Sequence, residues 1–237
     1  MISIDVNRLR LAPGLRVLDI GCGSGRHTAA IARSKGIQVL GADINPADVI
    51  ETKKRLIFQE RLEGKRGRWD LLAASINRLP FKDNFFDLIV CSEILEHIPD
   101  HRMAVAEVVR VLKPGRDLVV SVPRFWPERI CWALSREYHN ANNGHIRIYK
   151  KKELIKLLEN SGLKKWSSHY AHSLHVPYWW LKCLLGSTRK DAVAVNLYHD
   201  LLTWDIMKRP WITRFLDHLL NPILGKSLVL YLKKAED

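Results

Sequence analysis

The sequence contains no long hydrophobic run and no export signal. A membrane-spanning helix needs ~18 or more consecutive apolar residues, and the longest candidate, residues 176–185, is interrupted by Lys182. Residues 1–14 lack the basic and then apolar pattern of a signal peptide. The sequence therefore predicts no transmembrane segment, and we expect a cytoplasmic location.

Cysteine is scarce as well, with four residues in a chain of 237. No pair among Cys22, Cys91, Cys131 and Cys183 has the spacing of a zinc site or of a redox motif. We expect four free thiols, as is usual in a reducing compartment. No cluster of metal ligands is visible along the sequence, so we predict no metal.

Acidic residues are outnumbered, with 25 Asp and Glu against 38 Lys and Arg and a net charge of +13. Residues 123–237 carry +9 of this excess, from 19 basic and 10 acidic residues. Such a charge suits a nucleic acid, an anionic membrane surface or an acidic substrate, and does not choose between them. The hydrophobic content of 47% excludes a mainly disordered chain. The length predicts one domain with an elaboration.

The first half alternates between short apolar runs and helical patterns. The runs predict buried strands over 16–20, 37–42, 69–73, 86–91 and 117–122. Helices are predicted over 24–35, 46–58 and 103–112, the second with Asn45 as its N-cap and Pro46 at its first position. Strands that alternate with helices imply a parallel sheet covered on both faces. In such sheets, ligands bind beyond the carboxyl ends of the strands.

A glycine-rich turn, VLDIGCGSG at 17–25, joins the first strand to the first helix. Glycine lets the backbone turn tightly and approach a ligand, and the free N–H groups at a helix start favour an anionic group. A dinucleotide fingerprint needs G-x-G-x-x-G, but Arg26 stands where the third glycine would be. This departure disfavours an NAD-dependent oxidoreductase.

Asp43 ends the second strand, 22 residues after Gly21. A carboxylate at that position can accept hydrogen bonds from ribose hydroxyls. Together the turn and Asp43 favour a nucleoside that carries a carboxylate and no pyrophosphate. S-adenosylmethionine (SAM) is such a ligand.

Four stretches then carry a resemblance to a known family: VLDIGCGSGRHT (17–28), GADIN (41–45), LPFKDNFFDLIVCSEILEHIPD (79–100) and EVVRVLKPG (107–115). With them, residues 15–122 resemble the SAM-binding core of a class I SAM-dependent methyltransferase of the small-molecule type. The resemblance implies an α/β fold, a Rossmann-like seven-stranded sheet that is mostly parallel with an antiparallel last strand. It also implies SAM as the cofactor and S-adenosylhomocysteine as its product.

The resemblance implies a role for each matching residue. Asp19 would help to place the amino-acid part of SAM, and Gly21, Cys22 and Gly23 would let the backbone approach it. Asp43 would bind the ribose.

Further along the chain, the resemblance implies that Ile44 packs on the adenine. Ser75 and Ile76 occupy the place where relatives usually carry an acid that binds the adenine amino group, so this sequence departs from the pattern there. Cys91 and Ser92-Glu93 would line the methionine end.

Beyond the core, the resemblance implies a helix over 150–161, a sixth strand over 163–170 and an antiparallel last strand over 227–234. Residues 171–226 are then an insert between strands six and seven. Its periodicity predicts helices, one of which has an apolar stripe and ends at Asn221-Pro222: Ile212, Phe215, Leu216, Leu219 and Leu220. Together with 123–148, we expect this insert to form a helical cap on the substrate side of a single domain spanning 1–237.

Histidines of the second half are candidates for a general base. We predict His145, because the segment 144–149 resembles a family element near the active site. His139, His172 and His175 are alternatives.

The sequence thus predicts an enzyme that methylates a small acceptor by in-line displacement. The cap is rich in aromatic residues (Tyr178, Trp179, Trp180), which suits a lipophilic or aromatic acceptor and also peripheral contact with a membrane surface. The alternatives are an RNA methyltransferase and a catalytically inactive SAM-binding module. Nucleic acid is disfavoured, because the motif of base-amino methylases is replaced by CSEI at 91–94.

Overall fold

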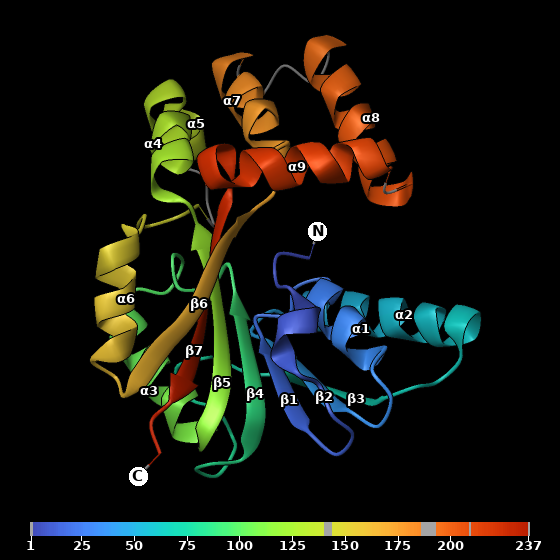
Figure 1. Ribbon diagram of the computed structural model, residues 1–237, viewed down its shortest axis with the longest axis vertical. Helices are drawn as coiled ribbons and strands as arrows, with labels where there is room; N and C mark the ends of the chain where they lie inside the picture. The colour runs from blue at the N-terminus through green and yellow to red at the C-terminus, as the bar shows by residue number, and fades with distance from the viewer. Residues whose placement is uncertain (1, 140–143, 186–192, 209, 237) are drawn as a thin grey trace.

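A seven-stranded sheet with the strand order β3-β2-β1-β4-β5-β7-β6 forms the centre of the protein (Figure 1). The computed structural model describes residues 2–139, 144–185, 193–208 and 210–236. The strands are β1 (Arg16–Ile20), β2 (Gln38–Asp43), β3 (Arg68–Ala73), β4 (Phe86–Ser92), β5 (Leu112–Pro123), β6 (Leu163–Ala171) and β7 (Ser227–Lys234). β7 runs antiparallel to both β5 and β6, and the other pairings are parallel. The predicted sheet is thereby confirmed.

Two hydrophobic cores cover the two faces of this sheet. One contains the apolar sides of α3 (His101–Val111) and α6 (Lys151–Glu159), and the other those of α1 (Arg26–Ala32) and α2 (Pro46–Glu63). A short 3-10 helix, η1 (Val6–Leu9), joins the second core through Leu9. Side chains of a strand alternate between faces, so Leu18 and Ile20 of β1 enter the first core while Val17 enters the second.

Local sequence signals set most element boundaries. Asn45 caps α2 by accepting a hydrogen bond from the Ala47 N–H at 3.1 Å, as predicted. α1 begins at Arg26, two residues later than predicted, because Gly25 has a left-handed backbone with φ 76°. The four cysteines are free and buried, in agreement with the sequence.

The second half of the chain adds helices at the carboxyl edge of the parallel strands (Figure 1). α4 (Phe125–Leu134) and α5 (Arg136–His139) follow β5, while α7 (His175–Leu185), α8 (Val193–Lys208) and α9 (Trp211–Leu224) lie between β6 and β7. The helical insert 171–226 is therefore present at its predicted place. No helix among the described residues has the length and apolar character that crossing a membrane requires.

The expected end of α9 at Asn221-Pro222 is wrong, because the helix continues to Leu224. A proline within a helix removes one N–H donor, and the last carbonyls of a helix need partners. The guanidinium of Arg124 supplies them by donating to the carbonyls of Asn221, Pro222 and Ile223 at 3.3, 3.0 and 2.9 Å. Most of the predicted apolar stripe of α9 is exposed, and no residue of this helix is fully buried.

Candidate active site at the carboxyl edge of the sheet

The glycine-rich turn lies where the strand order of the sheet reverses. β1 pairs with β2 on one side and with β4 on the other, which is the crevice where α/β sheets bind ligands. Gly21, Gly23 and Gly25 all have positive φ, at 69°, 51° and 76°. The N–H groups of Gly21 and Cys22 both donate to the Ala42 carbonyl, at 2.7 and 3.0 Å, and so fix the turn to β2.

Asp43 connects this turn to the start of α2. One carboxylate oxygen accepts a hydrogen bond from the Gly23 N–H at 2.8 Å, and the other accepts one from the Asn45 N–H at 2.9 Å. A carboxylate has about four acceptor sites. Each oxygen of Asp43 can therefore accept a further hydrogen bond from a ligand.

Asp19 lies beneath the turn and is 1% exposed. One of its oxygens accepts a hydrogen bond from the Thr28 hydroxyl at 2.5 Å, and the other has no partner among the described residues. Burial raises the pKa of Asp19 to about 6, although the hydrogen bonds from Thr28 oppose the shift. Asp19 thus supports the turn from behind, through α1.

Glu93 follows β4 and has a left-handed backbone, with φ 56°. This conformation costs a non-glycine residue roughly 1–2 kcal/mol. Two hydrogen bonds to Ser121 hold it: the Glu93 N–H donates to the Ser121 carbonyl at 2.8 Å, and the Ser121 hydroxyl donates to the Glu93 carboxylate at 3.0 Å. Burial raises the pKa of Glu93, and the neighbouring Lys226 opposes that shift.

A cavity of about 600 Å³ opens between the turn and the cap helices. Of the residues predicted to bind the cofactor, it is lined by Gly21, Cys22, Gly23, Asp43 and Ser92. Glu93 also lines it, together with residues of the cap, among them His172, His175, Tyr178, Trp179 and Lys226. The turn, β2, β4 and the insert therefore share one cavity.

The other predicted cofactor residues lie outside the lining of this cavity. Ile76 and Cys91 are buried in the core beside α3. The Ser75 hydroxyl accepts a hydrogen bond from the Asn77 N–H at 3.3 Å. Ile44 is 73% exposed at the end of β2, which leaves its side chain accessible to a ligand.

The candidate base histidines separate into two groups. His172 and His175 line the cavity, and burial lowers the pKa of both, that of His175 to about 4. His145 does not line the cavity. Its Nδ1 lies 2.6 Å from a carboxylate oxygen of Glu128 on α4. The side chain of His139 lies outside the described residues.

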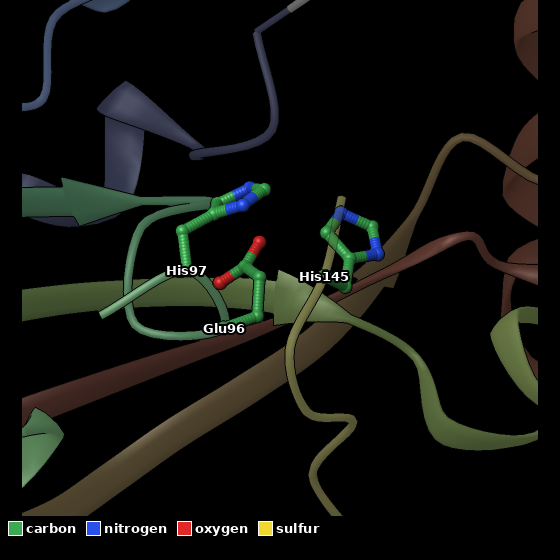
Figure 2. Close-up of side chains that lie close together, drawn as sticks. All are labelled: Glu96, His97 and His145. Atoms are coloured by element: carbon green, nitrogen blue, oxygen red, sulfur yellow. The ribbon is translucent and has the colours of Figure 1, made fainter. Parts of the chain in front are cut away.

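No local sequence pattern reveals how two further parts of the site come together. The Lys226 ammonium lies 4.3 Å from the centre of the Trp179 ring, a contact that forms only once the insert returns to β7. Glu96, His97 and His145 also converge, with potential ligand atoms within 4.8 Å of one another (Figure 2). These residues belong to segments 48 positions apart, so no local spacing reveals the group.

Comparison with known proteins agrees with this architecture. A family model described as a methyltransferase domain matches residues 3–168. Cycloartenol-C-24-methyltransferase 1 of Oryza sativa subsp. japonica is 32% identical over 147 residues, which cover 62% of this chain and 39% of that protein. Ubiquinone biosynthesis O-methyltransferase of Hahella chejuensis is 33% identical over 141 residues, which cover 55% of this chain and 56% of that protein. The chain thus spans less than two thirds of the length of either relative.

A solved structure shows the same fold along the whole chain. The SAM-dependent methyltransferase of Methanosarcina mazei superposes with a TM-score of 0.62 at 18% sequence identity, covering 99% of both chains.

The glycine turn yields a paired test. A Cβ on Gly21 would lie 1.9 Å from Cδ1 of Ile94, whereas one on Gly23 would meet no atom within 4 Å. Both substitutions strain a positive φ by roughly 1–2 kcal/mol, and Gly21→Ala also overpacks the turn by roughly 1–3 kcal/mol. In urea unfolding, Gly21→Ala should lower the free energy of unfolding clearly more than Gly23→Ala. Equal losses would contradict the packing described for the turn.

Proposed function

Since the chain belongs to the class I SAM-dependent methyltransferases, we propose that it binds SAM in the 600 Å³ cavity and transfers the methyl group to a small, lipophilic or aromatic acceptor. The observation that carries this proposal is the convergence of the glycine turn, Asp43 and Glu93, which come from three neighbouring strands, on one cavity.

The geometry of the turn supports SAM as the ligand. The positive φ values and the open space beside Gly23 allow a ligand to approach the backbone. Asp43 retains acceptor capacity for two ribose hydroxyls, and the exposed Ile44 beside it is available to the adenine. Ser75 and Ile76 follow β3, and we assign them to the adenine edge on the resemblance alone.

SAM, when bound, supplies a methyl group already activated by its positive sulfur. The protein must then hold the acceptor in line and exclude water. Tyr178 and Trp179 of α7 form part of the cavity wall opposite the turn, so the cap would perform both tasks. With its pKa at about 4, His175 is a weak base at neutral pH, which favours positioning over proton abstraction by this residue.

An apolar acceptor is supported by a second cavity of about 630 Å³. The two cavities adjoin, because Arg26, His172, His175 and Ile206 line both. The second one adds apolar side chains from the N-terminal segment and α2, including Ile4, Phe58 and Leu62, which lie among charged side chains such as Arg55 and Glu63. The apolar side chains are the ones that an apolar acceptor would contact. The two relatives, named for cycloartenol and for ubiquinone biosynthesis, also favour a small molecule over RNA.

A transfer assay tests this proposal. The protein is incubated with SAM labelled on the methyl group and with either a total lipid extract or total RNA, and the label is counted in each fraction. We expect label in the lipid fraction. Asp43→Asn should raise the KM for SAM roughly ten- to a hundredfold, because a hydrogen bond to a charged group is worth about 1.5–3 kcal/mol.

Asp48→Asn provides the matched control for that assay. Asp48 accepts a hydrogen bond from the Asn45 side chain at 2.7 Å in the first turn of α2 and does not line the cavity, so its loss should leave the KM for SAM unchanged. Label in RNA alone would favour the RNA methyltransferase. SAM binding without label in either fraction would favour an inactive SAM-binding module.

We also propose that the outer side of the cap contacts an anionic membrane surface. Trp211, Phe215 and Leu219 of α9 and Leu197 and Met207 of α8 are all more than half exposed. Large exposed apolar surfaces mark interaction sites. Residues 171–226 also contain seven Lys and Arg against four Asp. Apolar side chains combined with positive charge are typical of segments that lie in the membrane interface.

Vesicle sedimentation tests this contact. We expect more protein on vesicles of phosphatidylcholine with phosphatidylglycerol than on phosphatidylcholine alone. The double variant Trp211→Ser, Phe215→Ser should bind at least about tenfold more weakly, because burying each aromatic side chain contributes roughly 1.5–3 kcal/mol. Met103→Ser changes an exposed apolar residue of α3 and should have no effect. Equal binding of the wild-type protein and the double variant would contradict the proposed contact.

A further inference from the structure

Glu96 is a buried carboxylate that forms no ion pair with any residue that the structure describes. It is 0% exposed, and neither of its side-chain oxygens has a hydrogen-bond partner among the described residues. A buried polar group without a partner is costly, and a buried charge is far more so unless it is paired or coordinates a metal. The carboxylate points toward the imidazoles of His97 and His145 (Figure 2).

The hydrogen bonds of the two histidines leave the same ring nitrogen free. The Nδ1 of His97 lies 3.2 Å from the Gly144 carbonyl oxygen, which can only accept, so Nδ1 carries the proton. The Nδ1 of His145 lies 2.6 Å from a carboxylate oxygen of Glu128, which fixes the proton in the same way. In the neutral imidazole, Nε2 then keeps its lone pair.

This pattern is that of histidines that bind metals. A metal-binding histidine almost always donates its other ring N–H to a carboxylate or a backbone carbonyl, which fixes the tautomer and the orientation of the ring. Here Glu128 and the Gly144 carbonyl supply one partner of each kind. Ligand atoms of zinc lie ~2.0–2.2 Å from the ion, so atoms that now lie within 4.8 Å of one another would have to draw together by roughly 1 Å.

The backbone around the group is clamped in place. Arg147 donates hydrogen bonds to the carbonyls of Leu95, Ile98 and Pro99, at 3.2 Å for the first and 2.8 Å for the last. The Ile146 N–H donates to the Glu96 carbonyl at 3.0 Å. The loop after β4 and the segment that carries His145 are therefore held together before any ion binds.

Three acidic side chains and one ammonium lie near this point. The carboxylate of Glu96 interacts electrostatically with those of Glu93 and Glu128. The ammonium of Lys226 lies close enough to interact with all three carboxylates. The guanidinium of Arg147 is engaged with backbone carbonyls. A divalent cation bound here would stabilise the ionised form of the carboxylates around it.

We propose that Glu96, His97 and His145 bind a first-row divalent metal ion, such as Zn²⁺, through one carboxylate oxygen and two Nε2 atoms. Three protein ligands leave at least one coordination position open. Glu93 lies three residues before Glu96 and lines the cavity, so the ion would lie next to the cavity. An acceptor oxygen bound there would lose its proton more readily. That role rests on the proposed methyl transfer, whereas metal binding itself does not. As a ligand, His145 would act on the acceptor through the ion rather than as the general base.

Zinc titration tests the site directly. The full chain, freed of any affinity tag and of metal by chelation, is titrated with Zn²⁺ in competition with a chromophoric chelator. We expect one tightly bound ion per chain and a higher melting temperature with Zn²⁺ than with EDTA. Glu96→Gln and His145→Gln should each weaken binding at least about a hundredfold, and Glu128→Gln should weaken it by about 10- to 100-fold through the orientation of His145.

His101→Gln is the matched control, because this histidine sits close by but contacts the Tyr149 hydroxyl instead of the group. It should bind Zn²⁺ as the wild-type protein does. Urea unfolding in EDTA checks folding, and Glu96→Gln should be at least as stable as the wild type, because it removes a buried carboxylate without a partner. Absence of bound Zn²⁺ in the wild-type protein would overturn the proposal. So would a Zn²⁺ affinity in Glu96→Gln and His145→Gln equal to that of the wild-type protein. SAM binding, measured separately, keeps this result distinct from the test of methyl transfer.

Discussion

The carboxylate of Asp43 is the interaction on which the site depends. It accepts hydrogen bonds from Gly23 in the turn after β1 and from Asn45 at the start of α2, so one side chain fixes two elements that follow neighbouring strands. Because an aspartate accepts more hydrogen bonds than these two, the group that shapes the turn can also bind a ligand. The same geometry then explains why the turn needs glycine: the backbone at Gly21 and Gly23 has positive φ, and Ile94 occupies the space beside Gly21.

The other half of the site is contributed by segments far along the chain. Arg147 holds the segment before α6 against the loop after β4, and the helices between β6 and β7 complete the cavity wall. These parts meet only at the carboxyl edge of the sheet, which is where the parallel strands end. The cavity is thus bounded by the turn and Asp43 on one side and by the insert on the other.

Sequence patterns predicted the sheet because its strands are short apolar runs bounded by clear turn signals, and β1 and β7 begin and end where expected. They also predicted the turn and Asp43 as neighbours, because consecutive parallel strands end at one edge. Contacts between residues far apart in the sequence could not be predicted from these local patterns. Pro222 stays helical because Arg124, 98 residues away, binds its carbonyl. Glu96 and His145 meet because Arg147 donates hydrogen bonds to backbone carbonyls of the loop after β4. The periodicity of the sequence carries no information about such contacts.

A crystal structure with S-adenosylhomocysteine tests the central claim most directly, because it shows which side chains surround the ligand. The account predicts electron density for the ribose within hydrogen-bond distance of Asp43, with the amino-acid part over the glycine turn and the sulfur toward Glu93. Density elsewhere on the chain, or a ribose that does not contact Asp43, would contradict it.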